Sequence, residues 1–297
     1  MTNPSVYRGR FAPSPTGPLH KGSLVAAIAS YLEAKAHHGE WLVRMEDVDE
    51  LRNVKGAADG ILRSLEAYGF EWDGEVMYQT QRKDAYADAL QQLQAQKRLY
   101  PCTCSRRQLR AQAAQGVLQN GPMGYIYPGT CIDNSFDDFA SDDYAIRIRT
   151  PDMLYTFSDN LQGEYSQQLK TDLGDFVIRR RDGLFAYQLA VVVDDAYQKI
   201  THVVRGLDLI DSTPRQIFLQ QCLKFPHPEY SHLPLIVNAQ GEKLSKQTGA
   251  TGIGNTANIP LLVECLNFLG QKPPAELKRE SLDNVWQWAT DNWTLHR

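Results

Sequence analysis

The 297-residue sequence contains no apolar run long enough to cross a bilayer, and its first residues lack the apolar core of a secretory signal. We therefore expect a cytoplasmic protein without membrane contact. Basic charge is also not in excess, because 31 Lys and Arg face 35 Asp and Glu, which gives a net charge of -4. Contact with a nucleic acid would have to depend on local arginines such as residues 179–181, although such groups are common on solvated surfaces.

Cysteine is scarce, with five residues in the whole chain, and a disulfide-stabilised fold is therefore not expected. Cys102, Cys104 and Cys131 lie close together in the sequence, whereas Cys222 and Cys265 fit no ligand spacing and are predicted to be core residues. Spacing alone leaves two interpretations of the group of three, a metal site or three buried free thiols.

The segment at residues 10–23 lacks both the Walker spacing and the Gly-x-Gly-x-x-Gly pattern of phosphate-binding loops. It instead places three prolines and a glycine between an apolar stretch at residues 6–11 and a helix-favouring stretch that runs from Gly22 to Gly39. This order predicts a strand, a rigid loop and a helix whose N-terminus favours a phosphate, with His20 two residues ahead of the helix. A surface loop without function is the alternative interpretation.

The first hundred residues alternate between the two element types. Strands are predicted at residues 41–45 and 70–72, and helices at residues 55–68 and 82–96. Such alternation indicates a parallel sheet covered by helices, in which ligands collect at the carboxyl ends of the strands. Residues 10–14 and Glu46 would lie at that edge.

Beyond Pro101 the composition becomes richer in Gly, Asp and Gln, which indicates an insertion between two halves of the sheet domain. A strand is predicted within it at residues 144–149. The α/β order then returns with a hairpin at residues 176–187 that turns at Asp182-Gly183, a strand at residues 199–205 and a helix from Ser212. The predicted organisation is an α/β catalytic domain in residues 1–100 and 175–258, an inserted subdomain in residues 101–174, and a C-terminal helical segment in residues 259–297, where Leu282, Val285, Trp286 and Ala289 have core spacing.

A second charged loop follows a predicted strand at residues 235–237. Lys243 and Lys246 flank a leucine and a serine there, and a Gly/Thr-rich stretch comes next. Two flexible ammonium groups at this spacing could close over a polyphosphate. A tetrapeptide of this kind is, on its own, more often a solvated turn.

Together the two loops resemble the signature motifs of class I aminoacyl-tRNA synthetases. Residues 20–23 correspond to the HIGH motif and residues 243–247 to the KMSKS motif. Lys21 replaces the usual apolar residue and Gln247 the usual serine, and neither change removes a group needed for chemistry. Four segments, residues 10–20, 44–49, 185–190 and 203–208, are similar to the catalytic domain of glutamyl-tRNA synthetases, and the resemblance extends to about residue 258.

The resemblance implies a Rossmann-type fold that activates L-glutamate with ATP and Mg²⁺. It assigns the catalytic group to His20, Gly22, Lys243 and Lys246, of which all but Lys243 also bind ATP. It implies that Glu46 binds the ammonium of glutamate and that Tyr187 and Arg205 bind carboxylate oxygens. The full glutamate pocket would comprise Arg10, Phe11, Ala12, Pro13, Ser14, Glu46, Tyr187 and Arg205. Without the resemblance, Glu46 would be interpreted as a surface acid, Tyr187 as a packing residue and Arg205 as an exposed ion pair.

Chain length narrows the resemblance further. Only about fifty residues follow the KMSKS-like loop, and we therefore expect no anticodon-binding domain. This is similar to the short paralogues of glutamyl-tRNA synthetase, which place glutamate on the queuosine base at the wobble position of tRNA(Asp). We therefore expect a monomer that binds L-glutamate, ATP and queuosine-containing tRNA(Asp). The alternatives are a truncated synthetase that charges a tRNA 3′ end, an adenylyltransferase, and a catalytically silent RNA-binding paralogue.

The same family uses a Cys-x-Cys pair followed downstream by Tyr-x-x-x-Cys as a zinc site. Cys102, Cys104, Tyr127 and Cys131 match this pattern. The resemblance thus implies one structural Zn²⁺ per chain, held in a closed tetrahedral site within the inserted subdomain.

Overall fold

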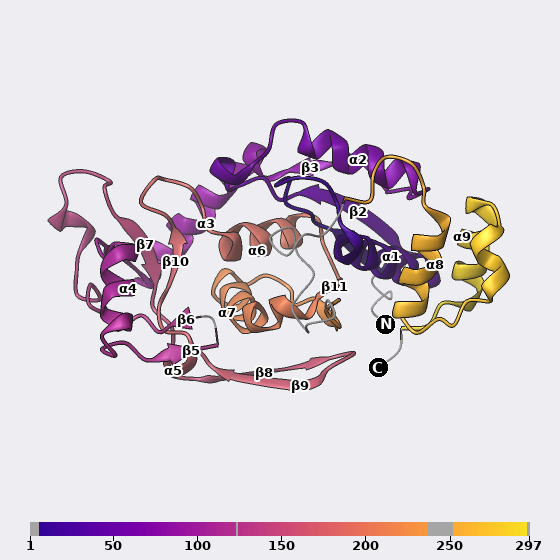
Figure 1. The fold of residues 1–297 in the computed structure, drawn as a ribbon. Helices are drawn as coiled ribbons and strands as arrows, with labels where there is room; N and C mark the ends of the chain where they lie inside the picture. Colours follow the sequence, from indigo (N-terminus) through magenta and orange to yellow (C-terminus); the bar gives the residue numbers. More distant parts are fainter. Residues whose placement is uncertain (1–5, 123, 237–251, 296–297) are drawn as a thin grey trace.

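The computed structural model describes residues 6–122, 124–236 and 252–295 (Figure 1). Its first half alternates strands and helices, as the sequence predicts. The parallel strands β1 (Arg8–Phe11), β2 (Glu40–Met45) and β3 (Met77–Tyr78) form one sheet, with Arg10 of β1 opposite Leu42 of β2. The helices that alternate with them are α1 (Lys21–Ala36), α2 (Ala57–Ala67) and α3 (Lys83–Ala95).

Two details of this half differ from the prediction. The first strand begins at Arg8, and Val6, which the prediction includes, is exposed. The predicted strand at residues 70–72 is wrong, and β3 lies further along the chain. Phe70 is buried there by stacking on Trp41, with ring centroids 5.5 Å apart, so aromatic packing accounts for the apolar character of this stretch.

The second half contains a four-stranded sheet in the order β11 (His202–Gly206), β12 (Glu229–Leu233), β8 (Leu154–Asp159) and β9 (Gly163–Gln168). Its edge strand β11 lies beside β1, where the Thr201 amide donates to the Arg8 carbonyl over 3.0 Å. The helices α6 (Tyr187–Tyr197) and α7 (Thr213–Leu223) accompany it, and the predicted helix start at residues 212–214 is confirmed.

Three predictions of local structure need comment here. The turn at Asp182-Gly183 is confirmed, since Gly183 has a φ of 87°. Its return arm is reduced to one bridge between Arg179 and Phe185, because α6 already begins at Tyr187. Of the strand predicted at residues 235–237, the last residue lies outside the described part, and the other two follow the end of β12 without strand structure.

A smaller antiparallel sheet in the order β10 (Phe176–Arg179), β7 (Ala145–Ile148) and β4 (Leu99–Cys102) leads to one end of the molecule. There lie α4 (Arg106–Ala114), the pair β5 (Asn120–Gly121) and β6 (Gly124–Tyr125), and the short α5 (Leu169–Asp172). At the opposite end lie α8 (Ile259–Phe268) and α9 (Leu282–Asn292) (Figure 1). Short 3-10 turns cover Glu50–Arg52, Gln79–Arg82, Phe136–Asp138, Leu207–Ser212 and Ala275–Arg279.

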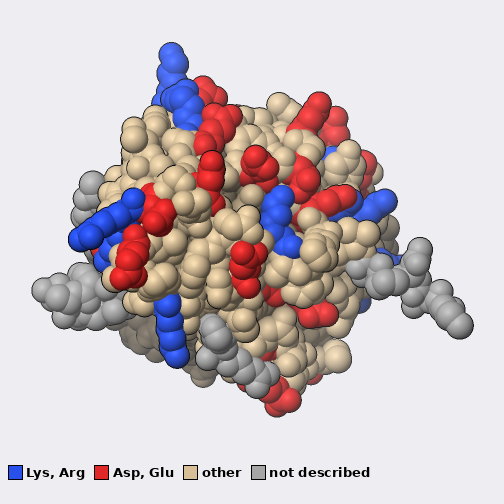
Figure 2. All heavy atoms as spheres, turned by 90° about the vertical axis from the view of Figure 1, so that its right-hand side faces the viewer, with Lys and Arg blue, Asp and Glu red and all other residues tan. Residues whose placement is uncertain are grey.

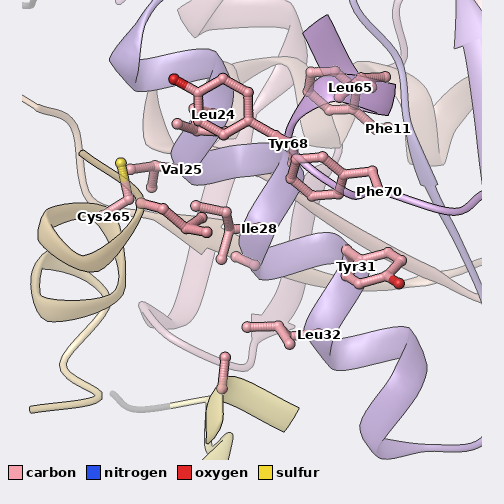
Figure 3. Close-up of a cluster of buried hydrophobic side chains, with 14 of the residues drawn as sticks. Phe11, Leu24, Val25, Ile28, Tyr31, Leu32, Leu65, Tyr68, Phe70 and Cys265 are labelled. Carbon is pink, nitrogen blue, oxygen red and sulfur yellow. The ribbon is translucent and has the colours of Figure 1, made fainter. Parts of the chain in front are cut away.

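Helix α1 is the centre of the largest core cluster (Figure 3). Its Leu24, Ile28 and Leu32 are fully buried among side chains from the first sheet, α2 and the C-terminal helices. Cys265 of α8 joins this cluster and Cys222 is buried in the second one, as predicted. The predicted core spacing of α9 is confirmed, because Val285 and Ala289 are fully buried and Leu282 and Trp286 pack against the same cluster.

Acidic and basic side chains are interspersed on the face turned toward α8 and α9 (Figure 2). This mixture agrees with the small net charge of the chain and offers no single-sign surface at that end. Within the described residues, no helix is long and apolar enough to span a membrane.

Candidate functional site

A cavity of about 700 Å³ lies where the carboxyl ends of β1, β2, β11 and β12 meet. The residues predicted to bind glutamate or ATP that the structure describes all line it: Arg10, Phe11, Ala12, Pro13, Ser14, His20, Gly22, Glu46, Tyr187 and Arg205. Lys243 and Lys246 lie outside the described residues. Segments almost two hundred residues apart in the sequence thus contribute to one hollow, at the edge where parallel sheets bind ligands.

His20 differs from its predicted position by one step. It is the N-cap of α1 rather than a residue two positions ahead of the helix, and its Nδ1 accepts a hydrogen bond from the Ser23 amide over 3.2 Å. The side chain therefore satisfies one of the free amides at the helix start while still lining the cavity. A phosphate at this helix N-terminus, as the sequence predicts, would therefore lie beside the His20 imidazole.

A buried ion-pair network fixes the polar wall of the cavity. Asp195 of α6 accepts from Nε of Arg10 over 3.2 Å and pairs with Nη1 of Arg44 over 2.8 Å. Arg44 in turn pairs through Nη2 with Glu46 over 3.1 Å. All four side chains are nearly or fully buried, so the low dielectric around them strengthens each pair. Asp195 had no place in the sequence-based site, although an acid at the end of the apolar run at residues 189–193 was a signal for it.

The two carboxylates in this network titrate in opposite directions. Burial raises the pKa of Glu46, and the attraction of Arg44 and Arg10 opposes that shift only in part. Burial also acts on Asp195, yet there Arg10 and Arg44 prevail and hold the pKa below its usual range. Asp195 is thus paired with both Arg10 and Arg44 and orients them, whereas Glu46 pairs only with Arg44 among the described residues.

Arg205 reaches the cavity from the end of β11, and hydrogen bonds to neighbouring side chains hold its guanidinium in place. Its Nε donates to Nε2 of His232 over 3.0 Å, and one Nη donates to Thr213 over 2.8 Å. The other Nη donates to the Tyr187 hydroxyl over 3.4 Å. Nδ1 of His232 lies 2.6 Å from a carboxylate oxygen of Asp159, and both of these side chains are fully buried. The sequence carried no recognisable signal for His232, Asp159 and Thr213, since they come from two separate strands and a helix start.

A second cavity, of about 1000 Å³, adjoins the first. Ser14, Glu46 and Tyr187 line both, so these residues form the boundary between the two spaces. The second cavity continues along β10 and β7 as far as Cys104 and Tyr127. A larger ligand could therefore approach the first cavity from the side of β10 and β7.

The four predicted metal ligands come together at that far end. The sulfur atoms of Cys102, Cys104 and Cys131 all lie within 4.8 Å of one another, with 3.6 Å between the last two. The Tyr127 hydroxyl is 3.3 Å from Sγ of Cys102 and 3.6 Å from Sγ of Cys104. Metal–sulfur bonds of about 2.3 Å in a tetrahedron would place neighbouring sulfurs about 3.8 Å apart, so the spacing fits a closed metal site.

Two features bear on the ligand chemistry of this cluster. Burial raises the pKa of the Tyr127 hydroxyl, and hydrogen bonds with its cysteine neighbours raise it further. Phenolate ligation would therefore need a metal to displace the proton. Arg147 donates from Nε to Sγ of Cys102 over 3.3 Å and stacks on the Tyr127 ring at 3.7 Å, which places a cation where thiolate charge would gather.

Comparison with known proteins agrees with this geometry. The catalytic-domain model of class I tRNA synthetases for glutamate and glutamine matches residues 6–257. A glutamyl-Q tRNA(Asp) synthetase from Dechloromonas aromatica is 53% identical over 291 residues, which cover 98% of this chain and 95% of that protein. One from Chromobacterium violaceum is 53% identical over 297 residues, covering 100% and 96% of the two chains.

Solved structures give the same fold. The glutamate-tRNA synthetase of Elizabethkingia anophelis superimposes with a TM-score of 0.81 at 27% identity, over 98% of this chain and 66% of its own. A glutamate tRNA ligase from Elizabethkingia meningosepticum, solved in complex with its amino acid, gives 0.72 at 31% identity over 82% of this chain and 52% of its own. This chain thus spans between about half and two thirds of those longer enzymes. It belongs to the glutamyl-Q tRNA(Asp) synthetase family of ligases, which is built on the class I catalytic domain for glutamate and glutamine.

Proposed function

We propose that this chain activates L-glutamate with ATP and transfers it to the queuosine base at the wobble position of tRNA(Asp). The observation that carries the proposal is the charge pattern of the first cavity. A buried acid, Glu46, and a buried arginine, Arg205, both line it, and they match the ammonium and a carboxylate of free glutamate. A further guanidinium, that of Arg10, is held in place by Asp195.

In the first step, an oxygen of the glutamate α-carboxylate attacks the α-phosphorus of ATP. The bond to pyrophosphate breaks, and glutamyl-adenylate forms. Glu46 binds the ammonium, while Arg205 and Tyr187 fix carboxylate oxygens so that the attacking oxygen points toward the α1 end of the cavity. No covalent bond to the protein is required, so positioning and charge stabilisation supply the catalysis.

ATP is assigned to the α1 end, beside His20 and Gly22. Lys243 and Lys246 would stabilise the charge that builds on pyrophosphate, together with the Mg²⁺ that accompanies ATP. The described flanks of the intervening segment support this assignment. Leu235 and Ile236 line the cavity on one side, and Gly252 forms a bridge with His20 on the other.

In the second step, a hydroxyl of the queuosine cyclopentenediol attacks the activated carbonyl, and AMP leaves. The second cavity is assigned to this nucleoside because it opens onto the glutamate site at Ser14 and Tyr187. Bases that enter protein pockets are read best when they are splayed out of a loop, as an anticodon base can be.

We also propose that Cys102, Cys104, Tyr127 and Cys131 hold one Zn²⁺. The spacing of their donor atoms supports a closed, structural site. The ion would connect β4 to the loop before residue 132 and so fix the far wall of the second cavity.

The test of the function uses labelled glutamate, ATP and tRNA(Asp) prepared with and without queuosine. Removal of the 3′-terminal adenosine from both tRNAs eliminates ordinary aminoacylation. We expect label only on the queuosine-containing tRNA, within the nuclease fragment that carries the anticodon. If label appears on the intact tRNAs and is lost when the 3′-terminal adenosine is removed, the protein is a truncated synthetase. The absence of glutamate-dependent pyrophosphate exchange would favour a silent RNA-binding paralogue.

A further inference from the structure

Five arginines line the second cavity, and two of them, Arg180 and Arg181, are paired with carboxylates. Of the others, Arg147 donates to Cys102 Sγ and the Asp175 carbonyl, and Arg106 is exposed. Arg180 pairs with Asp49 over 2.9 Å and with Asp182 over 2.5 Å. Arg181 pairs with Asp143, and both of these side chains are about half exposed or more. These groups neutralise one another at the cavity mouth and offer little net charge to a ligand.

Arg215 is different. It follows the start of α7, lines the same cavity and has no carboxylate within ion-pair distance among the described residues. Its single hydrogen bond within that part of the chain is from Nη2 to the Ser212 hydroxyl, over 3.2 Å. Its Nε is sealed from solvent without a partner, and its guanidinium lies 5.7 Å from the Phe176 ring centre.

The surroundings of Arg215 leave its charge uncompensated. Asp211 acts on it only at longer range and accepts a hydrogen bond from the Tyr165 hydroxyl. Burial lowers the pKa of Arg215 to about 10, which still leaves the side chain charged at neutral pH. A guanidinium held in this way is costly for the free protein, and an anion that enters the cavity would relieve the cost.

We propose that Arg215 binds a backbone phosphate of the RNA whose nucleoside enters the second cavity. The inference rests on the proposed function, because it assigns the second cavity to the nucleic acid. RNA brings one phosphodiester anion with every nucleotide, and a guanidinium pairs with phosphate through two parallel hydrogen bonds. Nη1 has no partner among the described residues, and Nη2 donates there only to Ser212, so donors remain for such a contact.

The carboxylates of glutamate are not the favoured anion. Arg215 lines only the second cavity, whereas Arg10 and Arg205 line the first. Tyr187 separates the two groups, since it belongs to both walls. Arg215 is therefore expected to serve the transfer step and not the activation of glutamate.

The experiment compares Arg215→Gln with wild type in two assays. Glutamate-dependent pyrophosphate exchange reports the first step, and fluorescence anisotropy with queuosine-containing tRNA(Asp) reports RNA binding at several salt concentrations. We expect exchange to stay within twofold of wild type and tRNA binding to weaken about tenfold. The slope of log affinity against log salt should fall by about 1, which the loss of one phosphate contact predicts and a purely structural role does not.

The matched control is Arg181→Gln, which removes an arginine from the same cavity that is already paired with Asp143 and exposed. It should leave both the affinity and the slope near wild type. Should Arg215→Gln lower thermal stability and lose exchange through misfolding, Arg215→Lys carries the test. Lysine keeps the charge without the paired donors, so weaker binding at an unchanged slope supports the proposal, and unchanged binding overturns it.

Two other outcomes would overturn the inference. One is an unchanged salt slope in Arg215→Gln, and the other is a higher KM for ATP at unchanged thermal stability. Failure of the proposed function itself looks different, because wild type would then transfer no glutamate to queuosine-containing tRNA although the comparison of salt slopes could still be made.

Discussion

Arg205 donates a 3.0 Å hydrogen bond from Nε to Nε2 of His232. An arginine has no acceptor, so this bond requires a lone pair on Nε2 and assigns the ring proton to Nδ1. Asp159, 2.6 Å from Nδ1, accepts a hydrogen bond from Nδ1–H and so favours this tautomer. Asp159, which does not line the cavity, thus determines through His232 how the Arg205 guanidinium is oriented in it.

Asp159→Asn should weaken glutamate binding although residue 159 does not line the first cavity. The amide no longer selects the Nδ1–H tautomer, so Arg205 loses a fixed acceptor and its orientation becomes less defined. We expect the KM for glutamate in pyrophosphate exchange to rise about tenfold, the scale of one hydrogen bond to a charged group, while the KM for ATP stays unchanged. Asp152→Asn is the control, because it changes an exposed acid that accepts a hydrogen bond from Gln168. A parallel loss in both KM values and in stability would point to general disruption instead.

Stability against acid should depend on His232. Burial lowers its pKa from 6.5, although Asp159 opposes the shift. Below about pH 6.5 the unfolded chain therefore binds a proton that the folded protein does not, so stability falls as pH falls. His232→Gln should flatten the pH dependence of the free energy of unfolding between pH 7 and 5.5 by up to about 1.4 kcal/mol per pH unit. Urea unfolding at several pH values measures it. The pKa of Asp159 is lowered from 3.8, so Asp159 titrates outside this range. Equal slopes in the two proteins would contradict the assignment.

Glu46→Gln should raise the KM for glutamate about tenfold or more, because the ammonium loses its charged acceptor. The raised pKa of Glu46 adds a pH signature. As pH falls toward that pKa, wild type protonates this carboxyl and binds glutamate less well, whereas the variant has nothing to titrate. Steady-state exchange between pH 8 and 5.5 tests both effects. Glu50→Gln removes an exposed acid paired with Lys83 and should behave as wild type.

Elemental analysis should find one zinc per chain, and Cys104→Ser should lose it. Without the ion the thiols and the phenol would form only weak hydrogen bonds with one another. Amide protons of β4 and residues 126–132 should therefore exchange faster with solvent than in the zinc-bound protein. Cys222→Ala is the matched control, because it removes a buried thiol from a different cluster and should retain the metal. A metal-free wild type purified without chelators would end the zinc assignment.

Two glycines should respond oppositely to alanine. A Cβ at Gly39 would lie 2.3 Å from the Tyr7 carbonyl oxygen, so Gly39→Ala should destabilise the fold by about 1–3 kcal/mol. Gly60 lies within α2 with open space around it, so Gly60→Ala should stabilise by about 0.5–1 kcal/mol. Denaturant unfolding measures both. A stabilising Gly39→Ala would show that the close approach to β1 can relax.

The part of the site that sequence could predict was the part made of contiguous motifs. Residues 10–14 span the end of β1 and Glu46 follows β2, and the apolar character of both strands is evident, so their position at one sheet edge follows from the fold class. The members that could not be predicted make sense only through distant partners. Asp159 ends an ordinary strand and His232 lies within another, and their roles come from a pairing 73 residues apart in the chain.

The misplaced strand at residues 70–72 has the same origin. Aromatic and apolar residues favour a strand only when a neighbouring strand offers hydrogen bonds. Phe70 instead finds aromatic partners on β2 and α9, and Trp286 donates from Nε1 to the Tyr68 carbonyl over 2.8 Å. That partner lies more than two hundred residues downstream, beyond the reach of any local pattern.

The contact of Trp286 with Tyr68 also indicates how long a fragment of this chain must be in order to fold. The family match stops at residue 257, just before α8, yet α8 and α9 cover the side of α1 that bears Ile28 and Leu32. A fragment cut at that boundary would leave this side in water and release the helix that presents His20. The shortest autonomous unit of this chain therefore extends past residue 257, where the catalytic-domain model stops.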